Sequence, residues 1–165
     1  MVRVHLKTVG VDMASNSPVL LLTEDDGERA IKIYIGAPEA TAIAYAVQHV
    51  PTARPMTHDL LIDLLGALGA SLTQVVVTEV IESTFFAELH LDRDGATITL
   101  SSRPSDAIAI ALRADAPIYV ATELMNAVGV IMVEAASDDD EPENDLVDAF
   151  REFLDSIDPD DFQAS

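Results

Sequence analysis

Two stretches of the chain place residues that could bind a phosphate at the start of a predicted helix. One reads ARPMTHDLLIDLLGALGA over residues 53–70, and the other reads SSRPSDAIAIALRADAPIYV over residues 101–120. The free backbone N–H groups of a helix N-terminus bind anions, and an arginine beside them can donate two parallel hydrogen bonds to a phosphate. The candidate phosphate-binding residues are Arg54, Thr57, Arg103 and Ser105.

Neighbouring acids and one histidine could supply the chemistry of phosphodiester cleavage. Histidine is the side chain that most often transfers protons in catalysis, so His58 could move a proton. A divalent cation such as Mg²⁺ or Mn²⁺ prefers oxygen ligands and often takes only one or two from protein. Such a cation would also offset the repulsion between an acidic protein and a polyanionic substrate. The candidate catalytic residues are Glu39, His58, Asp59 and Asp106, with Glu39, Asp59 and Asp106 as metal ligands.

The same residues can also be explained as helix caps. Thr57 and Ser105 are good N-cap residues, and the proline before each favours a helix that begins there. Asp59 and Asp106 fall in the first turn, where the positive end of the helix dipole favours a carboxylate. Arg103 is close enough to Asp106 in sequence to pair with it. Capping and catalysis therefore both remain possible at this stage.

The composition limits the class of protein. The 165 residues are 49% hydrophobic, contain no Cys and carry a formal net charge of −20, which predicts one packed domain without disulfides or a thiolate site. No secretory segment or membrane-spanning run is present, so we expect a cytoplasmic protein. Residues 1–134 still carry 17 acids against 8 bases, so a basic patch for DNA or RNA must be local. No Gly-rich phosphate loop occurs, and no organic cofactor is expected.

The periodicity predicts an α+β fold with two similar units. Strands are expected over residues 2–11, 18–23 and 29–35, followed by a helix over 37–50. A second triplet of strands over 72–102 is followed by a helix over 105–113, and another helix occupies 57–68. The last predicted strand is VIMVEA, residues 130–135. Two units of strand-strand-strand-helix order suggest an internal duplication and a mixed, mainly antiparallel sheet packed with helices. The expected domain spans residues 1–134.

The end of the chain differs in composition from the domain. Residues 135–145 form an acidic linker. Residues 146–165 begin with an amphipathic pattern, DLVDAFREFLDSI read from Asp145, that predicts a short helix. Because so short a helix is marginal alone, it must dock on its own domain, on a second copy or on a protein partner.

Four blocks of the sequence resemble the bifunctional nuclease family, in its actinobacterial branch. They are IKIYIGAPEATAIAYAV, RPMTHDLLIDLLGALGASLTQVVV, FFAELHL and SSRPSDAIAIALRADAPIYV, and the resemblance covers about residues 2–134. It implies a compact α+β domain, a homo-oligomer with a dimer as the first guess, and degradation of DNA and RNA. Many members carry Asp at the position of Ser101. The family's polar signature falls on Glu39, Arg54, His58, Asp59, Arg103 and Asp106.

Two functions follow for testing. The first is a nuclease in which the acids hold Mg²⁺ or Mn²⁺ or orient water, His58 is the general acid or base, and Arg54 and Arg103 bind phosphate. The second is a non-catalytic oligomeric scaffold or regulatory module that binds a partner through its acidic tail and C-terminal helix. The net charge of −20 and Ser101 favour the second.

Overall fold

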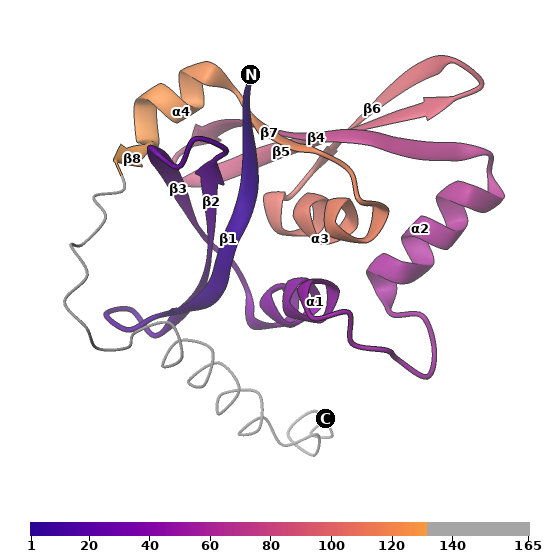
Figure 1. Ribbon diagram of the computed structural model, residues 1–165, viewed down its shortest axis with the longest axis horizontal. Coiled ribbons are helices and arrows are strands. Elements are labelled where there is room, and N and C mark those ends of the chain that lie inside the picture. The colour runs from indigo at the N-terminus through magenta and orange to yellow at the C-terminus, as the bar shows by residue number, and fades with distance from the viewer. Residues whose placement is uncertain (132–165) are drawn as a thin grey trace.

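The computed structural model describes residues 1–131, in which eight strands form one mixed sheet (Figure 1). The strand order is β6-β5-β4-β7-β1-β2-β3-β8. The strands are β1 (Val2–Asp12), β2 (Ser17–Glu24), β3 (Arg29–Tyr34), β4 (Ala70–Ile81), β5 (Thr84–Arg93), β6 (Ala96–Ser102), β7 (Ile118–Val120) and β8 (Val130–Ile131). The helices are α1 (Ala37–Val47), α2 (Thr57–Ala67), α3 (Pro104–Ala114) and α4 (Thr122–Val128).

Two antiparallel meanders lie side by side in the sheet, joined by β7. The element order β1-β2-β3-α1 recurs as β4-β5-β6-α3, with α2 inserted between the two sets. β7 pairs antiparallel with β1 and parallel with β4, so the first strand of each meander borders it. The predicted α+β fold with two strand-strand-strand-helix units in a mixed, mainly antiparallel sheet is confirmed.

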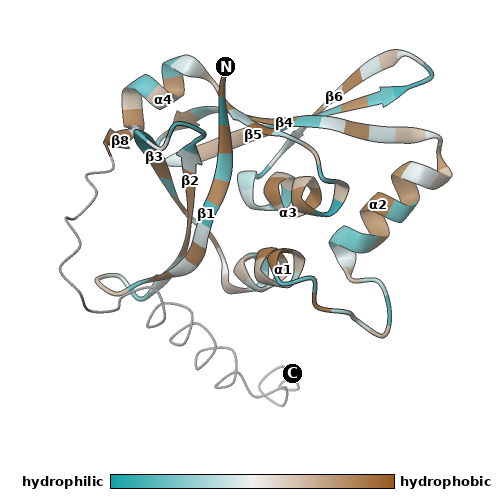
Figure 2. Cartoon of the chain, in the orientation of Figure 1, coloured by the Kyte–Doolittle hydropathy of each residue, from teal (hydrophilic) through white to brown (hydrophobic). Residues whose placement is uncertain are grey.

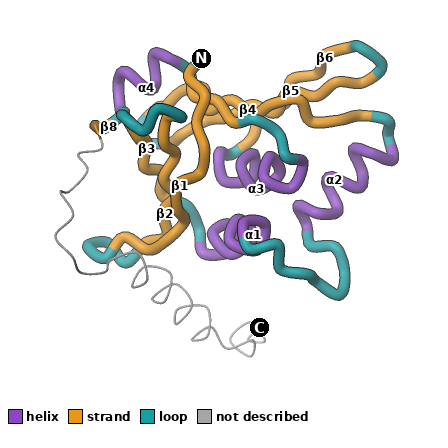
Figure 3. The backbone as a smooth tube through the Cα atoms, in the orientation of Figure 1, coloured by secondary structure: helices purple, strands orange, loops and turns teal. Residues whose placement is uncertain are grey.

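The strands form where hydrophobic residues alternate with polar ones. In β3, Ile31 and Ile33 are buried while Lys32 and Tyr34 are exposed, as period-two alternation requires. The β5–β6 hairpin turns at Asp94 and Gly95, which both have positive φ, the conformation that Asp-Gly favours in a two-residue turn. Figure 3 shows the two meanders and the short loops that connect their strands.

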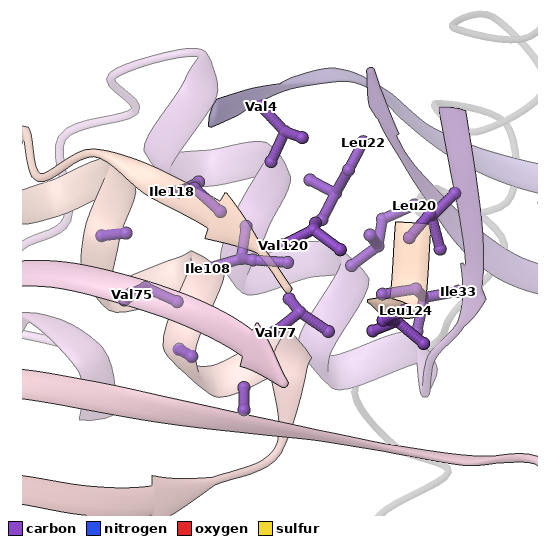
Figure 4. Packing of buried hydrophobic residues seen from close by; sticks show 14 of the residues in the cluster. Val4, Leu20, Leu22, Ile33, Val75, Val77, Ile108, Ile118, Val120 and Leu124 are labelled. Carbon is purple, nitrogen blue, oxygen red and sulfur yellow. The ribbon is translucent and has the colours of Figure 1, made fainter. Parts of the chain in front are cut away.

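The core lies between the sheet and α3. Val75 and Val120 lie beside the buried Ile108 of the helix, and Leu20 lies in the same buried cluster next to Ile33 and Leu124 (Figure 4). Because three of the buried residues of α3, at positions 107, 109 and 111, are alanines, the helix can approach its neighbours closely between its larger buried side chains. The beginning of α3 is therefore held in place by the best-packed part of the molecule.

Helix α2 packs differently from α1 and α3, since it has no buried residue. Four leucines remain exposed on it, and Figure 2 shows the helix as apolar over much of its surface. Their positions, separated mainly by three or four residues, lie on one side of the helix. The four leucines are Leu60, Leu61, Leu64 and Leu68, and the name α2 outer face is used below for Leu60, Leu64 and Leu68.

Several predictions concern residues outside the described part of the chain. The domain boundary at residue 134, the acidic linker over 135–145 and the helix over 146–165 all lie there. The last predicted strand begins inside the described part of the chain, as β8. Within residues 1–131, no helix has the length and apolar character needed to cross a membrane.

Candidate active site

A pocket of about 640 Å³ lies where three helices approach the β5–β6 hairpin. Its walls come from the first halves of α1, α2 and α3, and from apolar side chains on the two strands. We call it the active-site pocket. Its polar side chains include Glu39, His58, Arg103 and Asp106, and its apolar ones include Leu61, Leu89 and Leu100.

The two Arg-Pro segments begin helices, but the predicted N-caps are wrong. The N-cap of α3 is Arg103, with Pro104 in the first turn, and the N-cap of α2 is Met56. Pro104 enters the helix because its fixed φ suits the first helical position and it lacks the N–H that would be unsatisfied there. Thr57 and Ser105 consequently lie inside their helices, and neither makes a capping hydrogen bond.

Arg103 binds two carboxylates from different helices. Its Nε and Nη2 atoms donate to Asp106 Oδ2 and Oδ1 at 2.7 and 3.0 Å. Its Nη1 atom lies 2.9 Å from Oε1 of Glu39 on α1. The paired carboxylates raise the pKa of Arg103, with Asp106 as the main cause. A guanidinium has five N–H groups, so two remain for a ligand, and the Arg103 side chain is 65% exposed.

His58, on α2, contacts the same carboxylate. Its Nε2 atom lies 3.3 Å from Asp106 Oδ1, although the two residues are 48 positions apart. The imidazole is only 12% exposed. Burial acts to raise the pKa of Asp106, but hydrogen bonds from Arg103 and His58 outweigh it and hold that pKa below its usual range. Asp106 therefore stays ionised at neutral pH between a histidine and an arginine.

Glu39 packs over Gly36 as it reaches Arg103. A Cβ atom at Gly36 would meet Glu39 Oε2, so the Glu39 side chain would have to shift to make room for it. Gly36 is the N-cap of α1, and Glu39 lies in its first turn as predicted. The carboxylate therefore folds back over the start of its own helix, where the dipole favours it.

Asp59 faces a different part of the molecule from the other predicted acids. It accepts a hydrogen bond from the Met56 backbone N–H at 2.9 Å and another from Arg113 Nε. Arg113 is 10% exposed and lies at the end of α3, and its hydrogen bond lowers the pKa of Asp59. Both residues line a neighbouring pocket of about 650 Å³, and Asp59 does not line the active-site pocket.

The arrangement does not fit the predicted three-carboxylate metal site. Within residues 1–131, no three Asp, Glu, His or Cys side chains are grouped so as to hold a metal ion. Arg103 lies between Glu39 and Asp106, where a divalent cation would otherwise neutralise their charge. A metal would have to displace this guanidinium, so we derive no reaction step through Mg²⁺ or Mn²⁺.

The remaining predicted residues are divided among three places. Thr57 lines the active-site pocket, while Ser105 is buried at the edge of another pocket. Arg54 lies on the exposed loop before α2 and lines neither of these pockets. The sequence interpretation missed Arg113, which no local motif connects to Asp59, and it missed the apolar wall formed by Leu61, Leu89 and Leu100.

Comparison with known proteins assigns the chain to a family. The family model described as bifunctional nuclease domain matches residues 20–133, and this chain belongs to that family. An uncharacterised protein of Mycobacterium tuberculosis is 43% identical over 164 residues, covering 98% of each chain. Bifunctional nuclease 2 of rice is 30% identical over 139 residues, covering 81% of this chain and 43% of the plant protein.

A second plant relative matches over a similar portion. Bifunctional nuclease 2 of Arabidopsis thaliana is 29% identical over 125 residues, covering 74% of this chain and 38% of its own length. This chain thus spans less than half the length of both plant relatives, whereas the mycobacterial relative matches it from end to end.

Proposed function

We propose that this chain hydrolyses phosphodiester bonds of DNA or RNA at the active-site pocket. The observation that carries the proposal is that His58 and Arg103, from separate helices, both bind Asp106 within one pocket. This arrangement combines a group that transfers protons with a cation that binds phosphate. The names of the plant relatives, which are bifunctional nucleases, support the same reaction class.

His58 is the proposed general base. An ionised carboxylate can only accept a hydrogen bond, so the neutral imidazole has its hydrogen on Nε2, towards Asp106. Its Nδ1 atom is then free to take a proton from water as the water oxygen forms a bond to phosphorus. The bond from phosphorus to the leaving sugar oxygen breaks, and that oxygen receives a proton from the His58 imidazolium. Asp106 stabilises the imidazolium between these steps.

Arg103 is the proposed phosphate-binding residue. Its two remaining N–H groups can donate to the non-bridging phosphate oxygens, where negative charge increases as water attacks. Asp106 and Glu39 hold the guanidinium in position before substrate binds. The Arg103 side chain therefore loses less conformational freedom when the phosphate reacts. The exposed end of Arg103 leaves its remaining N–H groups accessible to a phosphate.

A matched pair of histidine variants tests the proposal. His58→Ala should lower the rate of cleavage of a labelled oligonucleotide by about 100-fold or more, the usual contribution of a general base. His5→Ala is the control, because the His5 ring also lies 3.3 Å from a carboxylate, that of Asp25, but at an exposed position of β1. Equal rates for the two variants would refute the role of His58. Parallel assays with Mg²⁺, Mn²⁺ or EDTA test the predicted metal dependence.

A non-catalytic regulatory module is the second candidate. The observation in its favour is that Arg103 is already paired with Glu39 and Asp106, so these residues could serve only to connect α1 with α3. A pull-down from cell extract with the full chain, compared with a chain ending at residue 134, tests this function. Partners captured only by the full chain, together with no cleavage of DNA or RNA, would favour the module over the nuclease.

A further inference from the structure

The active-site pocket has an apolar wall that the proposed reaction does not use. Leu61 comes from α2, and Leu89 and Leu100 come from the β5–β6 hairpin. Leu61 is 37% exposed and Leu100 is 47% exposed. Exposed aliphatic side chains that line a pocket commonly form the part of a binding site that takes the apolar portion of a ligand. We call Leu61, Leu89 and Leu100 the leucine wall.

The leucine wall lies close to both groups that would act on the phosphate. Leu61 follows His58 by three residues on α2, and residues at that spacing lie on the same side of a helix. Leu100 precedes Arg103 by three residues, near the end of β6. Leu89 pairs directly with Leu100 in the hairpin, so the two side chains are neighbours on one face of the sheet. A nucleotide whose phosphate lies at Arg103 would therefore have the wall within reach of its base.

The size and charge of the pocket favour one nucleotide over a double helix. The volume of about 640 Å³ is within the range of sites that enclose a single small ligand. Among the lining residues, all of which belong to residues 1–131, Arg103 is the one Lys or Arg. A double helix carries closely spaced phosphates on two strands, and one arginine neutralises little of that charge. The pocket thus offers few contacts to a phosphate backbone and several to a base.

We propose that the leucine wall binds one unpaired base of the substrate, so that the chain acts on single strands of DNA or RNA and not on duplexes. In a duplex, neighbouring bases cover both faces of each base, and an enzyme that takes a base into a pocket must remove it from the stack. Every base has a face that can pack on such a wall, so all four bases should be accepted. The cleavage step rests on the proposed function, but base binding at the wall does not.

Binding measurements without turnover test the proposal. Every protein is the full chain carrying His58→Ala, so that strands are not consumed. Fluorescence anisotropy gives the affinity for a fluorescein-labelled oligothymidylate, alone and annealed to oligoadenylate. We expect the single strand to bind at least 10-fold more tightly than the duplex, because a base of the duplex must first unpair and unstack. Adding Leu61→Ala should weaken single-strand binding about 10-fold, as expected when a base covers roughly half of the surface of the three lost carbons.

A matched control and a competitor separate the base contact from a general effect on the pocket. Leu60→Ala should leave the affinity unchanged, because Leu60 precedes Leu61 on α2 but belongs to the α2 outer face and does not line the pocket. The inhibition constant of inorganic phosphate should be the same with and without Leu61→Ala, since the wall contacts the base and not the phosphate. Leu100→Ala should act like Leu61→Ala, and it serves if that variant does not fold.

A duplex that binds as tightly as the single strand would overturn the proposal. Single-strand affinity that is insensitive to both Leu61→Ala and Leu100→Ala would overturn it too, as would a failure of both oligonucleotides to bind. Cleavage by the chain that retains His58 is measured separately. If single strands bind through the wall and nothing is cleaved, the proposed nuclease is refuted and base binding stands. If single strands and duplexes are cleaved equally well, the nuclease stands and the base-binding proposal is refuted.

Discussion

The ion pair between Asp59 and Arg113 should stabilise the fold measurably. Asp59 receives hydrogen bonds from Arg113 Nε and from the Met56 backbone, and Arg113 Nη1 also donates to Ala109 O at 2.9 Å. A hydrogen bond to a charged group contributes about 1.5–3 kcal/mol when well buried. Asp59 is 34% exposed, so solvent screens part of its attraction to Arg113 and reduces this contribution. We expect Asp59→Asn to cost about 1–2 kcal/mol and Arg113→Met about 2–3 kcal/mol.

A double-mutant cycle at neutral pH isolates the pair from its surroundings. Urea unfolding followed by circular dichroism gives the free energy of unfolding for the wild type, both single variants and the double variant. The expected coupling energy between Asp59 and Arg113 is about 1–1.5 kcal/mol. The Met56 hydrogen bond does not contribute to it, because the amide oxygen of Asn can still accept that bond. Asp63→Asn is the control, because Asp63 is exposed on the same helix and makes no ion pair within residues 1–131.

The coupling should also depend on pH in a defined direction. Arg113 lowers the pKa of Asp59 in the folded chain, so this carboxylate stabilises the fold fully above the unfolded pKa of about 4. The stabilisation should decline as the pH falls below that value and disappear once the folded carboxyl is protonated. A coupling below about 0.3 kcal/mol at pH 7, or one that persists undiminished at pH 3, would refute the reasoning.

Two further variants test the charge and the outer surface of the domain. Arg103→Gln should weaken oligonucleotide binding. It should also reduce the slope of log affinity against log salt by about 0.7, the value for one phosphate contact in a single strand. An unchanged slope would show that Arg103 does not contact a phosphate. Leu64→Glu, on the α2 outer face, should convert the predicted dimer to a monomer in size-exclusion chromatography with light scattering, because that face remains exposed. A monomeric wild type, or a dimer that survives Leu64→Glu, would exclude this interface.

Much of the fold could be predicted because local chemistry and tertiary structure agree. The alternation around Ile31 and Ile33 predicted a half-buried strand, and the Asp-Gly sequence at Asp94 predicted a hairpin. The start of α2 at Thr57 was predicted correctly, with its N-cap one residue earlier at Met56, whereas the N-cap of α3 was misplaced by two residues, at Ser105 in place of Arg103. The error in α3 arose because Pro104 was read as excluded from the helix, whereas proline is favoured in the first turn.

The site was less predictable, because it depends on contacts between distant segments. The predicted pairing of Arg103 with Asp106 is confirmed. The motif at residues 54–59 contains His58, which contacts the same carboxylate, while the catalytic role of His58 stays a prediction. Neither motif reveals that adjacent residues on α2 face different partners. Successive residues on a helix point about 100° apart, so Asp59 meets Arg113 while His58 meets Asp106.

The proposed nuclease function requires His58 and Asp106 to act as one unit in phosphodiester cleavage. The most direct test measures oligonucleotide cleavage by the wild type, His58→Ala, Asp106→Asn and the double variant under identical conditions. Residues that act as a unit have non-additive effects, so all three variants should cleave at similar rates, about 100-fold or more below the wild type. Wild-type cleavage by Asp106→Asn, or losses that multiply in the double variant, would contradict the account.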